Sequence, residues 1–280
     1  MRWKGRRESS NVEDRRGISP RGIVGGGLGG IVVIIVVLLL GGDPSSLLQN
    51  ISLDNQGTTS NYTETAEEKE LAQFVSVVLA ETEDVWHKIF SDANEVYTEP
   101  RLVLFSGSVE SACGIAGTAT GPFYCPGDQR LYIDLSFYDE LKNRFEAPGD
   151  FAMAYVIAHE VGHHIQKLTG VLDKVHSLRS QLSESEYNKY SIRLELQADF
   201  YAGVWAHYTE RADLLEEGDL EEALNAASAV GDDRIQKSSQ GYIVPDSFTH
   251  GTSEQRKRWF YKGYTTGDIS QGDTFSAREL

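Results

Sequence analysis

The amino-acid sequence predicts an α+β fold that is mostly helical, with a small sheet, and with one transmembrane helix ahead of the folded domain. Three observations support this prediction. Residues 22–42 contain no charged side chain. Apolar residues recur at spacings of three and four in several long segments, as in amphipathic helices. Two short segments are rich in aromatic and β-branched residues and are flanked by Gly, Pro and Asp, as strands are.

The apolar segment 22–42 is expected to cross a membrane. As a helix it would span roughly 31 Å, about the thickness of the hydrocarbon core of a bilayer. A cleaved signal peptide is the alternative, but its apolar region is usually shorter, and no A-x-A-like cleavage site follows this segment. The glycines at positions 22, 26 and 30 have the small-xxx-small spacing that would allow a homodimer through this helix.

The distribution of charge predicts a topology. Residues 1–21 form a basic head with seven basic and three acidic side chains, and no basic residue follows closely after residue 42. By the positive-inside rule the head is cytoplasmic. We therefore expect a single-pass protein of the inner (cytoplasmic) membrane whose folded domain is periplasmic or otherwise extracytoplasmic. The net charge of −16 argues against a nucleic-acid partner, because phosphate backbones would be repelled.

Residues 43–66 are rich in Ser, Thr, Asn and Asp and are expected to form a flexible tether, followed by a folded domain over residues 67–280. Cys113 and Cys125 are expected to form a disulfide that closes a Gly-rich loop, with two separate buried thiols as the alternative.

The elements expected in the domain are an amphipathic helix at 68–90, strands at 101–107 and 129–141, a buried helix at 151–168 and further helices at 173–182, 184–211, 219–230 and 253–262.

The stretch AYVIAHEVGHHIQKL, residues 154–168, contains the arrangement H-E-x-x-H. His159 and His163 are four residues apart, so on a helix their imidazoles point the same way and can bind one Zn²⁺ ion. Glu160 lies at the edge of the same face, where its carboxylate can reach a water on the metal. The residues before it are apolar, and ionisable groups in a buried helix are costly unless something compensates them. The pattern predicts one zinc ion per chain with a general base beside it.

Catalytic zinc needs a third protein ligand and an open position for water. Glu195 and Asp199 are four residues apart in SIRLELQADFYAGVWAHY, a second segment that predicts a largely buried helix. One of these carboxylates can complete the metal site while the other accepts the Nδ1–H of a ligand histidine. The spacing alone leaves open which carboxylate has which role.

The loop VPDSFTHGTSEQR contains two further candidates, His250 and Arg256. Zinc hydrolases need a cationic or hydrogen-bonding group for the oxyanion of the tetrahedral intermediate, and either side chain could provide it. The alternative is a plain capping role, in which Ser253 begins a helix and Arg256 is solvated.

Together these stretches resemble the bacterial, single-pass neutral zinc metallopeptidase family. The resemblance implies a zincin in which His159, His163 and Glu195 bind zinc, with Glu160 as base and Asp199 behind a ligand histidine. It extends through MRWKGRRESSNVEDRRG, GPFYCPGDQRLYIDLSFYDEL, YVIAHEVGHHIQ, ELQADFYAGVWAH, DLEEALNAASAVGDD and VPDSFTHGTSEQR. The last stretch is also similar to the T-H-P-x4-R motif of membrane metalloproteases, although Gly251 stands in place of the proline and predicts a less rigid loop.

The expected function is that of a membrane-anchored zinc metalloendopeptidase acting on a peptide or protein substrate, in which Glu160 takes a proton from the zinc-activated water. The strand RLYIDLSF is expected to hold an extended substrate by edge pairing. Two alternatives are a non-catalytic, zinc-stabilised binding or chaperone module at the membrane, and a latent enzyme whose cleft is covered by its tether or C-terminal tail.

Overall fold

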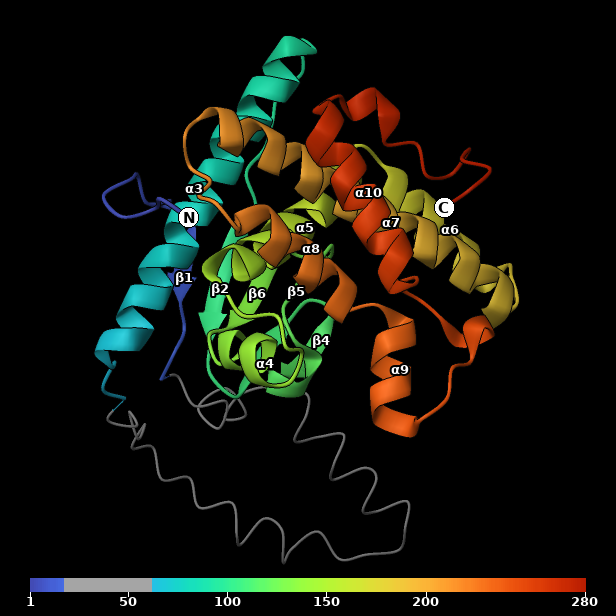
Figure 1. Cartoon of the computed structure of the whole chain (residues 1–280), viewed down its shortest axis with the longest axis horizontal. Helices are drawn as coiled ribbons and strands as arrows, with labels where there is room; N and C mark the ends of the chain where they lie inside the picture. Colours follow the sequence, from blue (N-terminus) through green and yellow to red (C-terminus); the bar gives the residue numbers. More distant parts are fainter. Residues whose placement is uncertain (18–61) are drawn as a thin grey trace, which may run out of the picture.

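The computed structural model describes residues 1–17 and 62–280, and these residues confirm a mostly helical α+β fold with small sheets. The predicted transmembrane helix at 22–42 and nearly all of the predicted tether at 43–66 lie outside the described residues. Figure 1 shows the helices gathered around the central helix α5, with the sheet on one side of it.

The main sheet has four short strands in the order β1-β2-β6-β5. β1, β2 and β6 run parallel, and β5 is antiparallel to β6. A second sheet is the antiparallel hairpin of β3 and β4. The strands are β1 (Val12–Asp14), β2 (Arg101–Phe105), β3 (Ser108–Ser111), β4 (Gly114–Gly117), β5 (Phe123–Cys125) and β6 (Arg130–Asp134).

β2 is apolar along nearly its whole length because both of its faces are covered. Leu102 and Leu104 belong to the main core, whereas Val103 and Phe105 point to the opposite face and pack in a smaller cluster with the hairpin. Strands buried on both faces have continuous apolar sequences of this kind. The predicted disulfide is confirmed: Cys113 of the hairpin turn is bonded to Cys125 at the end of β5, with an S–S distance of 2.02 Å.

The strand predicted at 129–141 ends much earlier than expected. Asp134, the last residue of β6, accepts hydrogen bonds from the backbone N–H and the hydroxyl of Ser136 at 3.1 and 2.9 Å. Its other carboxylate oxygen accepts from the N–H of Gly107 and the hydroxyl of Thr118. These bonds turn the chain, and residues 137–143 form a helix instead of continuing the strand.

The long helices begin close to where the sequence predicted them. α3 and α7 begin after Thr65 and Ser183, each of which forms a capping box with the glutamate three residues later. The short helices α4 and α9 were not predicted. The helices are α3 (Ala66–Asp92), α4 (Phe137–Asn143), α5 (Asp150–Leu168), α6 (Val171–Ser177), α7 (Glu184–Arg211), α8 (Asp219–Ala229), α9 (Asp232–Gln240) and α10 (Ser253–Thr266), with 3-10 turns at Thr118–Thr120, Leu178–Ser180, Pro245–Ser247 and Ile269–Gln271.

α5 is buried along almost its whole length because α3, α7, α8 and β5 all pack against it. Its contact with α7 is unusually close at Gly162. A Cβ atom at this position would lie 2.9 Å from the carbonyl oxygen of Ala198, closer than real Cβ atoms come to such a group. Glycine therefore allows the two helices that carry the H-E-x-x-H motif and the candidate carboxylates to meet at backbone distance.

The predicted topology, with the basic head and the folded domain on opposite sides of a membrane, is wrong. β1 lies within the head, and it pairs with β2 of the domain through Val12 and Leu102, Glu13 and Val103, and Asp14 and Leu104. A strand that is hydrogen-bonded within the sheet is on the same side of any membrane as the rest of that sheet. Over residues 1–17 and 62–280, moreover, no helix combines the length and the apolar character that a membrane crossing requires.

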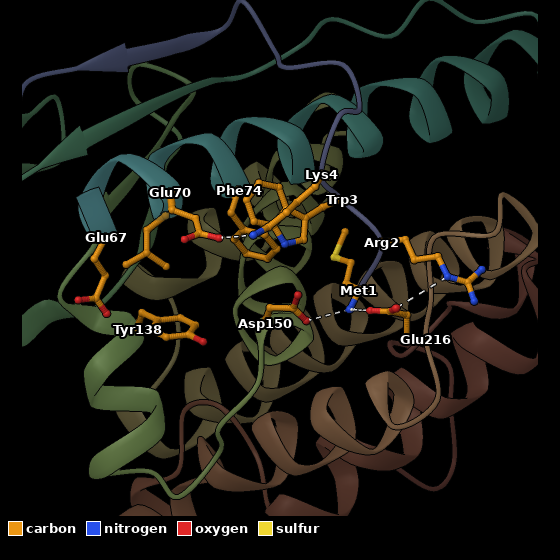
Figure 2. Close-up of a pocket in the computed structure, with 11 residues that line it drawn as sticks. Met1, Arg2, Trp3, Lys4, Glu67, Glu70, Phe74, Tyr138, Asp150 and Glu216 are labelled. Atoms are coloured by element: carbon orange, nitrogen blue, oxygen red, sulfur yellow. Dashed lines mark hydrogen bonds and ion pairs between the residues drawn. The ribbon is translucent and has the colours of Figure 1, made fainter. Parts of the chain in front are cut away.

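The first residues of the head are held at the start of α5, as Figure 2 shows. The Met1 ammonium lies 3.1 Å from Asp150, 2.9 Å from Glu216 and 3.2 Å from Asp219. Burial lowers the pKa of this ammonium, but the three carboxylates outweigh burial and raise the pKa to about 10. Trp3 is 7% exposed, and its ring meets the edge of Phe74 on α3 at a centroid distance of 5.5 Å.

Replacing Trp3 with alanine is expected to destabilise the fold by roughly 3 to 5 kcal/mol, because the change removes a buried ring from the main core. Urea denaturation followed by circular dichroism would measure the loss. Lys4→Ala is the matched control, since its exposed ion pair with Glu70 is worth at most about 1 kcal/mol. If the Trp3→Ala and Lys4→Ala chains were equally stable, the conclusion that the head is part of the core would be contradicted.

Candidate metal centre

Three side chains predicted as metal ligands come together where α5 crosses α7. His159 Nε2 lies 3.2 Å from Glu195 Oε2, and His163 Nε2 lies 3.5 Å from Glu195 Oε1. One donor atom from each residue lies within 4.8 Å of the others. Two imidazoles and a carboxylate in this arrangement are the ligand set of a catalytic zinc site that keeps one position open.

The outward-facing nitrogen of each imidazole is held by a second polar group. His159 Nδ1 lies 2.8 Å from Asp199 Oδ1, and His163 Nδ1 lies 2.9 Å from the amide oxygen of Gln166. Both partners accept hydrogen bonds, so they favour the tautomer with the proton on Nδ1 and leave the Nε2 lone pair for a metal. The donor set and its supporting bonds therefore fit zinc, with Glu195 as the third ligand and Asp199 behind His159.

The electrostatics of the three groups show how strongly they depend on a positive charge between them. Burial raises the pKa of Glu195, but the charges of His163 and His250 outweigh it and hold the pKa well below its usual range. Burial lowers the pKa of His159, yet Asp199 and Glu195 raise it to about 9. The buried carboxylates raise the pKa of both imidazoles, and a divalent cation between these groups would balance the same negative charge.

Glu160 lies in the cavity beside these residues and is 8% exposed. Burial raises the pKa of its carboxyl group, although the charges of His163 and His159 oppose this rise. A carboxylate with a raised pKa is a better proton acceptor at neutral pH than a solvated one.

Asp199 is the centre of a fully buried polar network. Besides His159, its carboxylate accepts the hydroxyl of Tyr155 at 2.5 Å and the guanidinium of Arg256 through Nε at 2.8 Å and Nη2 at 2.9 Å. Arg256 is 4% exposed, and its Nη1 donates to the carbonyl oxygen of Val230. The predicted alternative of a solvated Arg256 is therefore wrong. Its donors bind Asp199 of α7, Tyr155 of α5 and the carbonyl oxygen of Val230, so they hold α10 against these elements.

His250 lies on the rim of the same cavity, with half of its side chain exposed. Its Nδ1 is 3.2 Å from Asp232 Oδ1. The other oxygen of Asp232 accepts the backbone N–H groups of Thr249, His250 and Gly251 at 2.8, 2.6 and 3.0 Å. The loop is thus fixed by one carboxylate at the start of α9. Gly251 has a φ of +91°, which a proline could not adopt, so the glycine is required here.

The cavity has a volume of 440 Å³ and is lined by Glu160, His250 and the two imidazoles together with several apolar side chains. Phe123 and Tyr124 of β5 also line it.

The strand expected to pair with a substrate is not an edge strand. β6 is hydrogen-bonded on both sides, to β2 and to β5, so the expected edge role of RLYIDLSF is wrong. Among the described strands, the free edge next to the cavity is β5. Among the described residues that line the cavity, none belongs to the C-terminal tail at 266–280.

Sequence reasoning missed Gln166, Asp232 and Tyr155, which position predicted site residues. Gln166 is three residues after His163 and so lies on the same side of α5. It is fully buried in a helix of mostly apolar residues, and an uncharged polar residue in such a helix is itself a signal. Asp232 and Tyr155 had no comparable signal, because their partners are distant in sequence.

Comparison with known proteins agrees with this geometry. A family model described as "Putative neutral zinc metallopeptidase" matches residues 1–275. The protein YpfJ of Escherichia coli K12 is 50% identical over 285 residues, covering 98% of this chain and 99% of YpfJ. Rv2575 of Mycobacterium tuberculosis H37Rv is 45% identical over 195 residues, covering 66% of this chain and 65% of that protein. No solved structure matches. The chain belongs to the neutral zinc metallopeptidase family.

Proposed function

We propose that this chain is a zinc endopeptidase that hydrolyses peptide bonds with Glu160 as general base. The observation that carries the proposal is the convergence of His159, His163 and Glu195 in the cavity that also contains Glu160. Zinc held there supplies Lewis acidity, which lowers the pKa of a water molecule and polarises a carbonyl group. A metal that only joined two helices would not need a further buried carboxylate, that of Glu160, in the same cavity.

Each of the chain's own residues has a distinct part in the proposed reaction. Glu160 accepts the proton of the attacking water and passes it to the leaving amine. His250 donates from Nε2 to the carbonyl oxygen as negative charge develops, because Asp232 binds its Nδ1 and aims the other nitrogen away from the loop. Asp199 and Gln166 keep the two imidazoles in the orientation that a ligand requires.

An extended substrate is proposed to lie along β5. This strand is paired with β6 on one side only, and its residues Phe123 and Tyr124 line the cavity. Unpaired backbone groups at such an edge can bind a peptide by strand addition, which is independent of the side chains of the substrate. Glu160 and β5 line the same cavity, so a substrate paired with β5 would lie beside that carboxylate.

Metal removal tests the proposal directly. The purified chain is expected to bind one zinc ion and to cleave casein, and a chelator is expected to abolish cleavage until zinc is added back. Glu195→Gln should lower zinc affinity by at least tenfold, since it removes the charged ligand. Glu184→Gln, at the exposed start of the same helix, is the control. Zinc bound stoichiometrically without cleavage of casein or of unfolded proteins would favour a zinc-stabilised binding module instead.

Replacing His250 with alanine is expected to lower kcat by about 10² to 10³ with little change in KM, the usual effect of removing one oxyanion donor. Burial lowers the pKa of His250, but Glu195 and Asp232 raise it above the ordinary value. The protonated donor is lost as the pH rises through this pKa. Asp232→Asn should therefore move the alkaline limb of the pH–kcat profile to lower pH. An unchanged profile in both variants would exclude His250 from the reaction.

A further inference from the structure

A second cavity, which carries positive charge, lies beside the proposed catalytic cavity. It has a volume of 520 Å³ and lies between the end of α4 and α9. Phe145 and Ile235 line both cavities, so the two cavities are adjacent along these residues. Arg144, Arg234 and Lys237 line the second cavity, and Glu146 is the one carboxylate that does so.

Within the described part of the protein, carboxylates do not fully neutralise the cations that line this second cavity. Lys237 is exposed and has no side-chain partner there. Arg234 reaches Glu146 at 3.4 Å, but Glu146 is 82% exposed, so this ion pair is weak. Arg144 is 69% exposed and contacts Glu140 at 3.4 Å. A surplus of cations at this one place contrasts with the net charge of −16 of the whole chain.

The wall between the two cavities is apolar. Phe145 is half-buried and Ile235 is 36% exposed, so both offer contact area to a ligand that passes from one cavity into the other. Val156 and Val230 extend this apolar surface toward the metal centre. A peptide with its scissile bond at Glu160 would therefore cross an apolar stretch before it met the cations.

We propose that the second cavity binds a carboxylate of the substrate, so that the enzyme prefers a peptide with an apolar residue next to the scissile bond and a negative charge beyond it. The carboxylate can come from an acidic side chain or from the C-terminus of the peptide. This inference rests on the proposed function for the meaning of the scissile bond, but the binding itself does not need turnover.

The test uses the zinc-loaded full chain and three probes that differ only at the far end. Each is a succinyl hydroxamate with an isobutyl side chain, ending in glutamine amide, in glutamate amide or in glutamine with a free carboxylate. Isothermal titration calorimetry gives the three dissociation constants. We expect at least one charged probe to bind about fivefold more tightly than the neutral one, and the gain to shrink in high salt. The charged probe that binds more tightly than the neutral one identifies the source of the carboxylate.

The gain should disappear in Lys237→Gln combined with Arg144→Gln, while affinity for the neutral probe stays the same. Lys142→Gln, on α4 but outside the lining of either cavity, is the matched control. Equal affinity for all three probes in the unaltered chain overturns the inference, as does a gain that survives both substitutions. Casein cleavage is measured in parallel. Cleavage together with equal probe affinities would contradict this inference alone. Different probe affinities without cleavage would contradict the proposed hydrolysis alone.

Discussion

Replacing Glu160 with glutamine is expected to lower kcat by about 10² to 10⁴ while zinc content and stability stay nearly unchanged. Proton transfer by a positioned side chain contributes rate enhancements of this size, and glutamine cannot accept the proton. The variant should hold zinc because the ligand set consists of His159, His163 and Glu195. Removing a buried carboxyl group whose pKa is raised by burial also removes a cost to folding, so stability should not fall.

The measurements are turnover of a casein-derived fluorogenic peptide, zinc by atomic absorption, and the midpoint of urea unfolding. Glu254→Gln is the control, because that exposed side chain lies on α10 away from the cavity and should leave all three values unchanged. If Glu160→Gln retained more than about a tenth of the wild-type kcat, another group would have to be the base.

The second large effect is expected for Arg256→Met, which should destabilise the protein by roughly 3 to 5 kcal/mol. Methionine fills similar space but removes the larger of the two positive charges, Arg256 and His159, that keep the buried carboxylate of Asp199 ionised, and a buried charge that loses a partner is costly. Burial raises the pKa of Asp199, and Arg256 with His159 lowers it to about 2, so the carboxylate is charged at neutral pH in the intact network.

Urea denaturation of the zinc-free chains isolates this effect from metal binding. Arg258→Met on the same helix is the matched control, because Arg258 and its partner Glu279 are 46% and 85% exposed and their ion pair is worth at most about 1 kcal/mol. Adding Asp199→Asn to Arg256→Met should recover part of the loss, since the buried charge is then gone. A loss no larger than that of the control would mean that Asp199 is neutral or hydrated.

The convergence of the candidate metal ligands could be predicted from the sequence because its geometry is local. His159 and His163 are one helical turn apart, and so are Glu195 and Asp199, which means that two helices suffice to place four site residues. The capping boxes at Thr65 and Ser183 are local signals of the same kind. What the sequence could not show is that Arg256 turns inward, because its partner is fifty-seven residues away.

The errors also have physical causes. β1 is a three-residue strand of sequence VED, in which only Val12 is apolar, so it exists through its pairing with β2 and not through any pattern of its own. β6 resembled a long strand because aromatic residues follow it, and Asp134 ends the strand by accepting bonds from the nearby Ser136 and from the distant Gly107 and Thr118. The predicted topology depended on residues 22–42 and on charge counts, which contain no information about docking of the head.

The docking of the head brings two distant points of the chain together. Arg16 Nη2 lies 2.6 Å from Asp14 Oδ2 and 2.7 Å from Glu64 Oε1, and Arg16 Nη1 also contacts the carbonyl oxygen of Glu68. The chain therefore leaves the domain and re-enters it at almost the same place. The pairing of β1 with β2 and the ion pair between Arg16 and Glu64 thus fix where residues 17 and 62 lie, whatever sequence separates them.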